Sequence, residues 1–199
     1  MLRRSRIDAP DALHHVICRG IERRRIFRDD ADRNRFVELL ARVLEATSTR
    51  RYAWSLMPNH FHLLLKTGEV PLATILRRLL TAYAGSFNRR YRRHGHLFQN
   101  RYTSILCQED AYILPLIRYI HLNPLRAKIV ITIEELDRYP YAGHGALTGK
   151  VRADWQAVDE VLKLFGKRLI TPATKHVNSC SGCFGILPAA AEANCPGLF

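Results

Sequence analysis

The chain has 199 residues, of which 47% are hydrophobic, so it can bury a core of its own and is too apolar to be wholly disordered. Its 31 Lys and Arg residues outnumber the 18 Asp and Glu residues, and the net charge of +13 favours a polyanionic partner, above all nucleic acid. No run of about twenty apolar residues occurs, which excludes an ordinary membrane-spanning helix. The five scattered cysteines are typical of a reducing compartment, so we expect a cytoplasmic protein.

Hydrophobic periodicity predicts alternating strands and helices along most of the chain. We expect strands over residues 12–18, 51–57, 60–66 and 97–107, and helices over residues 32–46, 72–92 and 110–122. Pro124 is expected to end the last helix, because the residue before a proline is disfavoured in the helical region. The order strand–helix–strand–strand–helix–strand–helix predicts an α+β fold, a ferredoxin-like antiparallel sheet with helices packed on one face.

The last part of the chain differs from the rest in composition. Residues 155–165 predict one more amphipathic helix, whereas residues 170–199 contain a single base, Lys175, and a single acid, Glu192, and show no period. We therefore expect one domain over residues 1–165 and a poorly structured C-terminal tail over residues 166–199.

The sharpest local feature is His60-Phe61-His62 in the third predicted strand. Side chains two residues apart in a strand face the same side, so the two imidazoles share one face while Phe61 faces the core. Two imidazoles on one face can bind a divalent metal ion, although a bare His-x-His is a weak signal and a solvated sheet face is the alternative. For His14 and His15 two interpretations stand: one of them is a neighbour of the site, or both are ordinary residues of the first strand, which is the favoured interpretation.

A second feature lies at the end of the last predicted helix, where Tyr119 and Asn123 are four residues apart and share a helix face. A tyrosine can act as a nucleophile, and an asparagine can supply a metal-ligand oxygen. The alternative interpretation is a core tyrosine, followed by an asparagine that stops the helix before Pro124.

The basic charge is concentrated between Val70 and Gln108, where there is no acidic residue and seven arginines carry +7 of the +13. Arginine binds phosphate and aromatic rings stack on unpaired bases, so the mixture favours single-stranded or hairpin nucleic acid over a merely solvated helix face. The interleaved aromatic residues are Tyr83, Phe87, Tyr91, Phe98 and Tyr102. Together with one arginine of an earlier basic loop, the candidate DNA contacts are Arg23, Arg77, Arg78, Arg89, Arg90, Arg92, Arg93 and Arg101.

Four segments resemble, in order and spacing, the single-tyrosine HUH transposases with an IS200-like domain, and specifically the REP-associated tyrosine transposases. They are His14-His15-Val16-Ile17-Cys18-Arg19-Gly20 with Ile26-Phe27, then Met57-Pro58-Asn59-His60-Phe61-His62-Leu63-Leu64, then residues 95–104 and residues 118–127. The agreement of four separate motifs makes the resemblance specific, and it extends over roughly residues 10–165.

The resemblance implies a transposase that cleaves and rejoins single-stranded or hairpin DNA of palindromic repeats through a 5′-phosphotyrosine intermediate. Tyr119 would be the nucleophile, on a helix beside the strand that carries the histidines. His60, His62 and Asn123 would be the ligands of Mg²⁺ or Mn²⁺. The resemblance also implies a bacterial, nucleoid-associated protein that acts as a monomer or homodimer.

Two other functions fit the same residues less closely. One is a non-catalytic protein that binds hairpin nucleic acid and derives from a transposase. The other is a metal-dependent hydrolase of a different phosphodiester. Tyr119 discriminates between these functions and a transposase, because neither alternative needs a tyrosine nucleophile.

Overall fold

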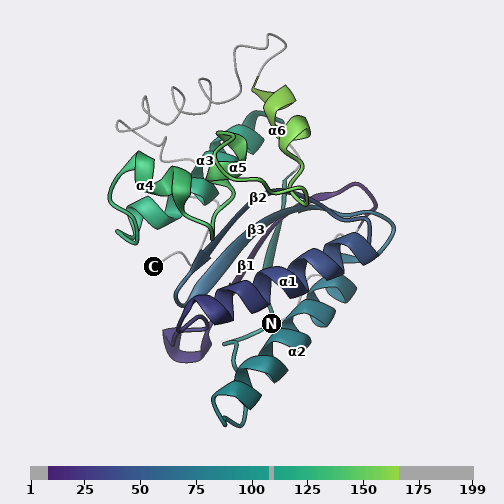
Figure 1. Cartoon of the computed structure of the whole chain (residues 1–199). Helices are drawn as coiled ribbons and strands as arrows, with labels where there is room; N and C mark the ends of the chain where they lie inside the picture. Colours follow the sequence, from purple (N-terminus) through teal and green to yellow (C-terminus); the bar gives the residue numbers. More distant parts are fainter. Residues whose placement is uncertain (1–8, 108–109, 166–199) are drawn as a thin grey trace.

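The computed structural model describes residues 9–107 and 110–165, and the predicted tail over residues 166–199 lies outside them (Figure 1). The strands are β1 (Leu13–Arg19), β2 (Arg50–Met57), β3 (His60–Lys66) and β4 (Thr103–Cys107). The helices are α1 (Asp30–Ala46), α2 (Leu72–Arg90), α3 (Asp110–Arg126), α4 (Ile133–Arg138), α5 (His144–Leu147) and α6 (Val158–Leu164), with a 3₁₀ turn η1 (Ile21–Arg23) after β1. The predicted order of strands and main helices is confirmed.

The four strands form one antiparallel sheet in the order β2-β3-β1-β4, which confirms the predicted α+β fold. The helices α1 and α2 cover one face together, as predicted, whereas α3 lies across the other face against β2 and β3 (Figure 1). Both faces of the two central strands, β3 and β1, are therefore buried. No helix within the two described ranges is long and apolar enough to cross a membrane.

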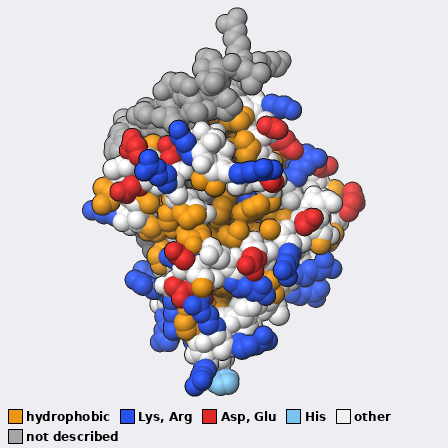
Figure 2. Space-filling model, in the orientation of Figure 1, with side chains coloured by type: hydrophobic (Ala, Val, Ile, Leu, Met, Phe, Trp, Pro, Cys, Tyr) orange, Lys and Arg blue, Asp and Glu red, His pale blue; other side chains and the backbone are white. Residues whose placement is uncertain are grey.

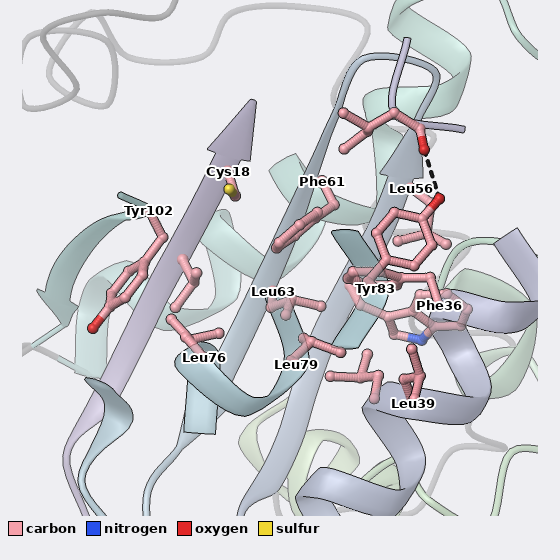
Figure 3. Packing of buried hydrophobic residues seen from close by; sticks show 14 of the residues in the cluster. Cys18, Phe36, Leu39, Leu56, Phe61, Leu63, Leu76, Leu79, Tyr83 and Tyr102 are labelled. Atoms are coloured by element: carbon pink, nitrogen blue, oxygen red, sulfur yellow. Dashed lines mark hydrogen bonds between the residues drawn. The ribbon is translucent and has the colours of Figure 1, made fainter. Parts of the chain in front are cut away.

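The main hydrophobic core lies between the sheet and the pair α1 and α2. Phe61 and Leu63 of β3 point into it, and Phe36 of α1 is fully buried among their neighbours. The ring centroid of Phe36 lies 4.8 Å from that of Phe61 and 5.1 Å from that of Tyr83 on α2. Figure 3 shows these side chains converging, and the Tyr83 hydroxyl donates a hydrogen bond to the carbonyl oxygen of Ile26. This cluster joins both helices to β3.

A smaller apolar cluster fixes α3 on the second face of the sheet. Ile117 and Ile120 of α3 are fully buried, and they share this cluster with Leu64 of β3. Leu64 points away from Phe61 and Leu63 because successive side chains of a strand alternate between the two faces. The side chains of β3 that point away from the main core thus face α3.

The helix α3 extends to Arg126, so the predicted end at residue 122 is wrong. The φ angle of a proline is compatible with a helix, although Pro124 removes one N–H donor and its ring crowds the carbonyl oxygen of the preceding turn. The N–H of Ala127 donates to the carbonyl oxygen of Asn123 at 2.9 Å and closes the last turn. Asn123 is therefore held inside the helix, one turn after Tyr119 and on the same face.

Several loops gather at the end of the sheet where β3 begins. The N–H of Ile26, in the loop after β1, donates to the carbonyl oxygen of Pro58 in the β2–β3 turn at 2.8 Å. Gly20 permits this tight path, because a Cβ at that position would collide with the carbonyl oxygen of Arg24. The loop that follows β1 is thus folded back against the turn that leads into His60.

Other differences from the predicted elements are local. The strand predicted over residues 97–107 is confined to Thr103–Cys107, and before it only Phe98 pairs with the end of β1, through an isolated bridge to Gly20. The helices α4 and α5 are not predicted, since segments of six and four residues are too short to show a helical period.

Replacing Phe36 by Ala is expected to lower the free energy of unfolding by about 3–5 kcal/mol, because it leaves a cavity among packed rings. Urea unfolding followed by circular dichroism measures this. Arg42→Ala, at an exposed position of the same helix, is the matched control and should change stability by less than about 0.5 kcal/mol. Equal effects of the two substitutions would contradict the described packing of α1.

Candidate active site

The strand β3 places the two histidines predicted to bind metal next to each other. Both project from the face of the sheet that α3 covers. Phe61, which lies between them in the strand, points to the opposite face and into the main core. Their ring centroids are 5.1 Å apart, with an angle of 77° between the planes. His62 is fully buried, whereas His60, at the start of the strand, is partly exposed. The pair therefore lies between sheet and helix and reaches the surface through His60.

The Nδ1 atom of each of these imidazoles forms a hydrogen bond with a neighbouring side chain. His62 Nδ1 lies 3.0 Å from Nε2 of His15 on β1, and the two rings stack with centroids 5.2 Å apart. His60 Nδ1 lies 2.7 Å from Oδ1 of Asn59 in the β2–β3 turn. Nε2 of His62 is buried and has no hydrogen-bond partner among the described residues. The contacts of Nδ1 leave Nε2 as the atom through which His62 can bind a ligand.

Burial keeps the three imidazoles neutral near pH 7. Loss of hydration lowers the pKa of His15 and that of His60 to about 4, and it lowers the pKa of His62 well below its usual value. Arg19, directly opposite His60 in the β1–β3 ladder, lowers the pKa of His60 further by its charge. A neutral imidazole keeps the lone pair that metal binding requires.

The helix α3 brings Tyr119 to the histidines within one chain. Its ring centroid lies 5.7 Å from that of His62 and 6.5 Å from that of His15, edge-on in both cases. The guanidinium of Arg126, two turns further along α3, lies 5.3 Å from the centre of the Tyr119 ring. The predicted tyrosine and histidines are thus neighbours.

Asn123 and Ser55 add polar groups to the same region. Asn123 follows Tyr119 by one helical turn, and Ser55 stands directly opposite His62 in the β2–β3 ladder. Asn123 Nδ2 and Ser55 Oγ are buried without a hydrogen-bond partner among the described residues. Within residues 9–107 and 110–165, no three His, Cys, Asp or Glu side chains form a group that could hold a metal ion. A third protein ligand would have to be of another type, such as the amide of Asn123.

The predicted DNA contacts fall into two regions of the molecule. Arg77 and Arg78 lie in the first half of α2, and Arg78 is about 18 Å from Arg90, the last residue of the helix, at the helical rise of 1.5 Å per residue. The other six lie at the end of the sheet that carries His60; they are Arg23, Arg89, Arg90, Arg92, Arg93 and Arg101. Figure 2 shows Lys and Arg side chains gathered around the lower end of the molecule, where α2 ends.

Arg90 differs from the other predicted contacts because its charge is already compensated. Its guanidinium pairs with Asp29 at 2.6 Å and with Asp32 at 2.7 Å, both at the start of α1. The stretch from Val70 to Gln108 contains no acidic residue, but the fold brings the carboxylates of Asp29 and Asp32 next to it. We do not retain Arg90 among the candidate DNA contacts.

The expectation that the interleaved aromatic residues stack on bases is wrong for three of the five. Tyr83, Phe87 and Tyr102 are each at most 6% exposed and belong to the main core. Tyr91 and Phe98 are partly buried against the same core. Tyr83 and Phe87 recur at helical spacing because they form the apolar stripe of α2. Nucleic acid has no access to the faces of the buried rings.

Two residues near the site are not singled out by the sequence. Of the two interpretations of His15, the structure supports that of a neighbour of the site, because its ring contacts both His62 and Tyr119. Arg19 lies beside His60 only through the register of β1 and β3. The alternation of side chains along residues 13–19 places His15 and Arg19 on one face of the sheet. It does not reveal which strand pairs with residues 13–19, or in which register.

Comparison with known proteins identifies the family of the chain. The family described as transposase IS200-like matches residues 9–123, more than half of the chain. The protein belongs to this family and is by class a DNA transposase, which confirms the resemblance found in the four motifs.

Among solved structures, the REP-associated tyrosine transposase bound to a REP hairpin has the same fold. The TM-score is 0.61 at 13% sequence identity, over 86% of this chain and 100% of that chain. A putative transposase from Deinococcus radiodurans R1 matches 60% of this chain and 95% of its own, with 18% identity and a TM-score of 0.42. No curated protein sequence matches the chain.

Proposed function

We propose that the protein cleaves and rejoins single-stranded or hairpin DNA with Tyr119 as the nucleophile. The observation that carries the proposal is the contact between the rings of Tyr119 and His62, 5.7 Å apart in one chain of a transposase family. A corner built only for packing would not leave His62 Nε2 and Asn123 Nδ2 buried without partners among the described residues, because each such atom destabilises the fold. A metal ion at His62 Nε2 and a phosphate oxygen that accepts from Asn123 Nδ2 would account for both atoms.

The residues around Tyr119 fit a divalent metal ion. His60 and His62 are held neutral with Nδ1 engaged, and Nε2 of His62 is buried and unpartnered within the described residues. We propose that His60, His62 and Asn123 hold the ion, since imidazole and amide donors suit Mn²⁺ and tolerate Mg²⁺. When bound, such an ion supplies a Lewis acid that polarises the scissile phosphate.

Tyr119 carries the covalent step in this proposal. Its phenolic oxygen forms a bond to phosphorus while the bond from phosphorus to O3′ of the preceding nucleotide breaks. The phenol proton passes to solvent, and the leaving oxygen takes up a proton to become a 3′-hydroxyl. Attack of a 3′-hydroxyl on the resulting 5′-phosphotyrosine restores the phenol and a DNA phosphodiester, so no ATP is needed. Arg126 stabilises the attacking phenolate through its position beside the ring.

We propose that the basic end of the sheet binds the DNA. Arg19 lies beside His60, while Arg23 and Arg92 are exposed around the same end of the sheet. The similar REP-associated transposase was solved with a REP hairpin, so the hairpin of a palindromic repeat is the proposed substrate. Tyr119 and His62 meet within one chain, and the site can therefore assemble in a monomer as well as in a homodimer. Such a substrate fits a cytoplasmic, nucleoid-associated protein.

Tyr119→Phe is expected to abolish the covalent protein–DNA adduct, because phenylalanine lacks the attacking oxygen. Incubation with a labelled hairpin and Mn²⁺, followed by denaturing electrophoresis, measures the adduct. Hairpin affinity should change by less than about twofold, since the ring and its contacts remain. Tyr112→Phe, at a 52% exposed position of the same helix, is the matched control and should form the adduct normally. Adduct formation by Tyr119→Phe would refute the assignment, and its absence from the unmodified protein would favour a non-catalytic hairpin-binding protein.

His62→Ala is expected to lower the affinity for Mn²⁺ by about 100-fold or more, because it removes a direct ligand rather than a supporting group. Isothermal titration with MnCl₂ measures the loss, and EDTA should stop adduct formation while the hairpin stays bound. His96→Ala, at an exposed histidine outside the site, should bind Mn²⁺ like the unmodified protein. Equal affinities of the two variants would exclude His62 as a ligand.

Arg92→Ala is expected to weaken hairpin binding and to reduce the slope of log affinity against log salt by about 0.7–0.9, the value for one phosphate contact. Fluorescence anisotropy at several salt concentrations measures both. Arg78→Ala, at an exposed arginine in the first half of α2 and about 18 Å from the end of that helix, should have the smaller effect. A larger effect of Arg78→Ala would place the DNA at the other end of α2.

A further inference from the structure

We propose that His15 and Asn59 are positioning residues that hold His62 and His60 in the tautomer protonated at Nδ1, so that both Nε2 atoms are available to the metal ion. The inference rests on the proposed function and deepens it, because it concerns how the metal site is prepared. Neither residue is placed on the ion itself. Each acts through the histidine that it contacts.

The contacts of Asn59 determine the tautomer of His60. Asn59 Nδ2 donates to the carbonyl oxygen of Arg23 at 3.3 Å, so this nitrogen is turned toward the loop after β1. The other atom of the amide, Oδ1, lies 2.7 Å from His60 Nδ1. An amide oxygen only accepts hydrogen bonds, and His60 must therefore carry its proton on Nδ1. The lone pair of neutral His60 is then on Nε2.

The backbone holds Asn59 in this orientation. The N–H of Gly20 donates to the main-chain carbonyl oxygen of Asn59 at 2.8 Å, which ties the β2–β3 turn to the end of β1. The same loop supplies the carbonyl oxygen of Arg23 that accepts from Asn59 Nδ2. Side chain and main chain of Asn59 are thus anchored to the segment that follows β1, and the amide cannot rotate without losing a hydrogen bond.

His15 plays the corresponding part for His62. The contact from His15 Nε2 to His62 Nδ1, at 3.0 Å, admits a donor on either side. If His15 donated, the proton of neutral His62 would be on Nε2, which is buried and has no acceptor among the described residues. If His62 donates instead, Nε2 is an unprotonated acceptor that a cation can occupy. The second arrangement avoids an unsatisfied buried donor and matches the tautomer assigned to His60.

The position of His15 makes it suited to this task. It lies on β1, a central strand, and it is only 1% exposed. Its ring stacks on that of His62 at 18° and meets that of Tyr119 at 80°, so it contacts a proposed ligand and the proposed nucleophile at once. A ring enclosed in this way cannot rotate freely, and it restricts the rotation of His62 about its own side-chain bonds.

The tautomers can be observed directly in the metal-free protein. Nitrogen-15 NMR of histidine-labelled protein distinguishes a protonated from an unprotonated ring nitrogen. We expect His60 and His62 both to show protonated Nδ1 and unprotonated Nε2 near pH 7. Protonated Nε2 on His62 without metal would overturn the inference for His15, and the same result on His60 would overturn it for Asn59. This measurement needs no variant of His15 or Asn59.

Substitutions test the effect on metal binding. His15→Phe fills the site with a ring that cannot accept a hydrogen bond, and it should lower Mn²⁺ affinity by about 10- to 100-fold, the usual effect of losing a supporting partner. His15→Gln can present Oε1 near the position of Nε2, so it should restore most of the affinity. Asn59→Ala should lower the affinity over the same range. If His15→Phe is folded by circular dichroism and binds Mn²⁺ like the unmodified protein, His15 is not a positioning residue.

His14→Gln is the matched control for the substitutions of His15. His14 is the preceding residue of β1 and is similarly buried, but its side chain lies on the opposite face and contacts Ser104 Oγ at 3.2 Å. The Mn²⁺ affinity of the His14→Gln variant should equal that of the unmodified protein. Failure of the unmodified protein to bind Mn²⁺ would refute the proposed function, whereas normal binding by both His14→Gln and His15→Phe would refute the present inference alone.

Discussion

The packing of α3 across the second face of the sheet is the constraint on which the candidate active site depends. Ile117 and Ile120 are buried in one cluster with Leu64, and burial of an Ile side chain contributes about 1.5–3 kcal/mol. Tyr119 lies between these two anchors in the sequence, so fixing them fixes the tyrosine beside His62. The enclosed position of His62 also lowers its pKa through lost hydration. One packing contact thus positions the proposed nucleophile and keeps a proposed ligand neutral.

The site is a polar region set between two apolar ones. His62 Nε2, Ser55 Oγ and Asn123 Nδ2 are buried without partners among the described residues, and each such atom costs about 1–3 kcal/mol. The rings around Phe36, on the far side of the same sheet, provide stability that does not depend on these atoms. Because the main core lies on the other face of the sheet, the fold tolerates the cost of these buried polar groups. It also places the proposed metal ligands on strands and a helix rather than on loops.

Much of the fold follows from patterns that are local in the sequence. The strand His60–Lys66 has the predicted bounds, because a short apolar run between the Pro58-Asn59 turn and Lys66 is typical of a buried strand. The end of α3 does not follow, because the hydrogen bond of Ala127 to Asn123 outweighs the local preference against a helix before Pro124. The aromatic residues of α2 were misassigned because core packing and base stacking favour the same residue types at the same spacing.

The sequence by itself determined the order of the elements, the face shared by His60 and His62, the spacing of Tyr119 and Asn123, and the transposase family. These properties depend on neighbours within a few residues, where the periods of strands and helices apply. Only the tertiary structure decided that His15 contacts His62, and that Asp29 and Asp32 compensate the charge of Arg90. The physical reason is that these contacts join segments 47 to 61 residues apart, and strand pairing and helix packing bring such segments together without leaving a local pattern.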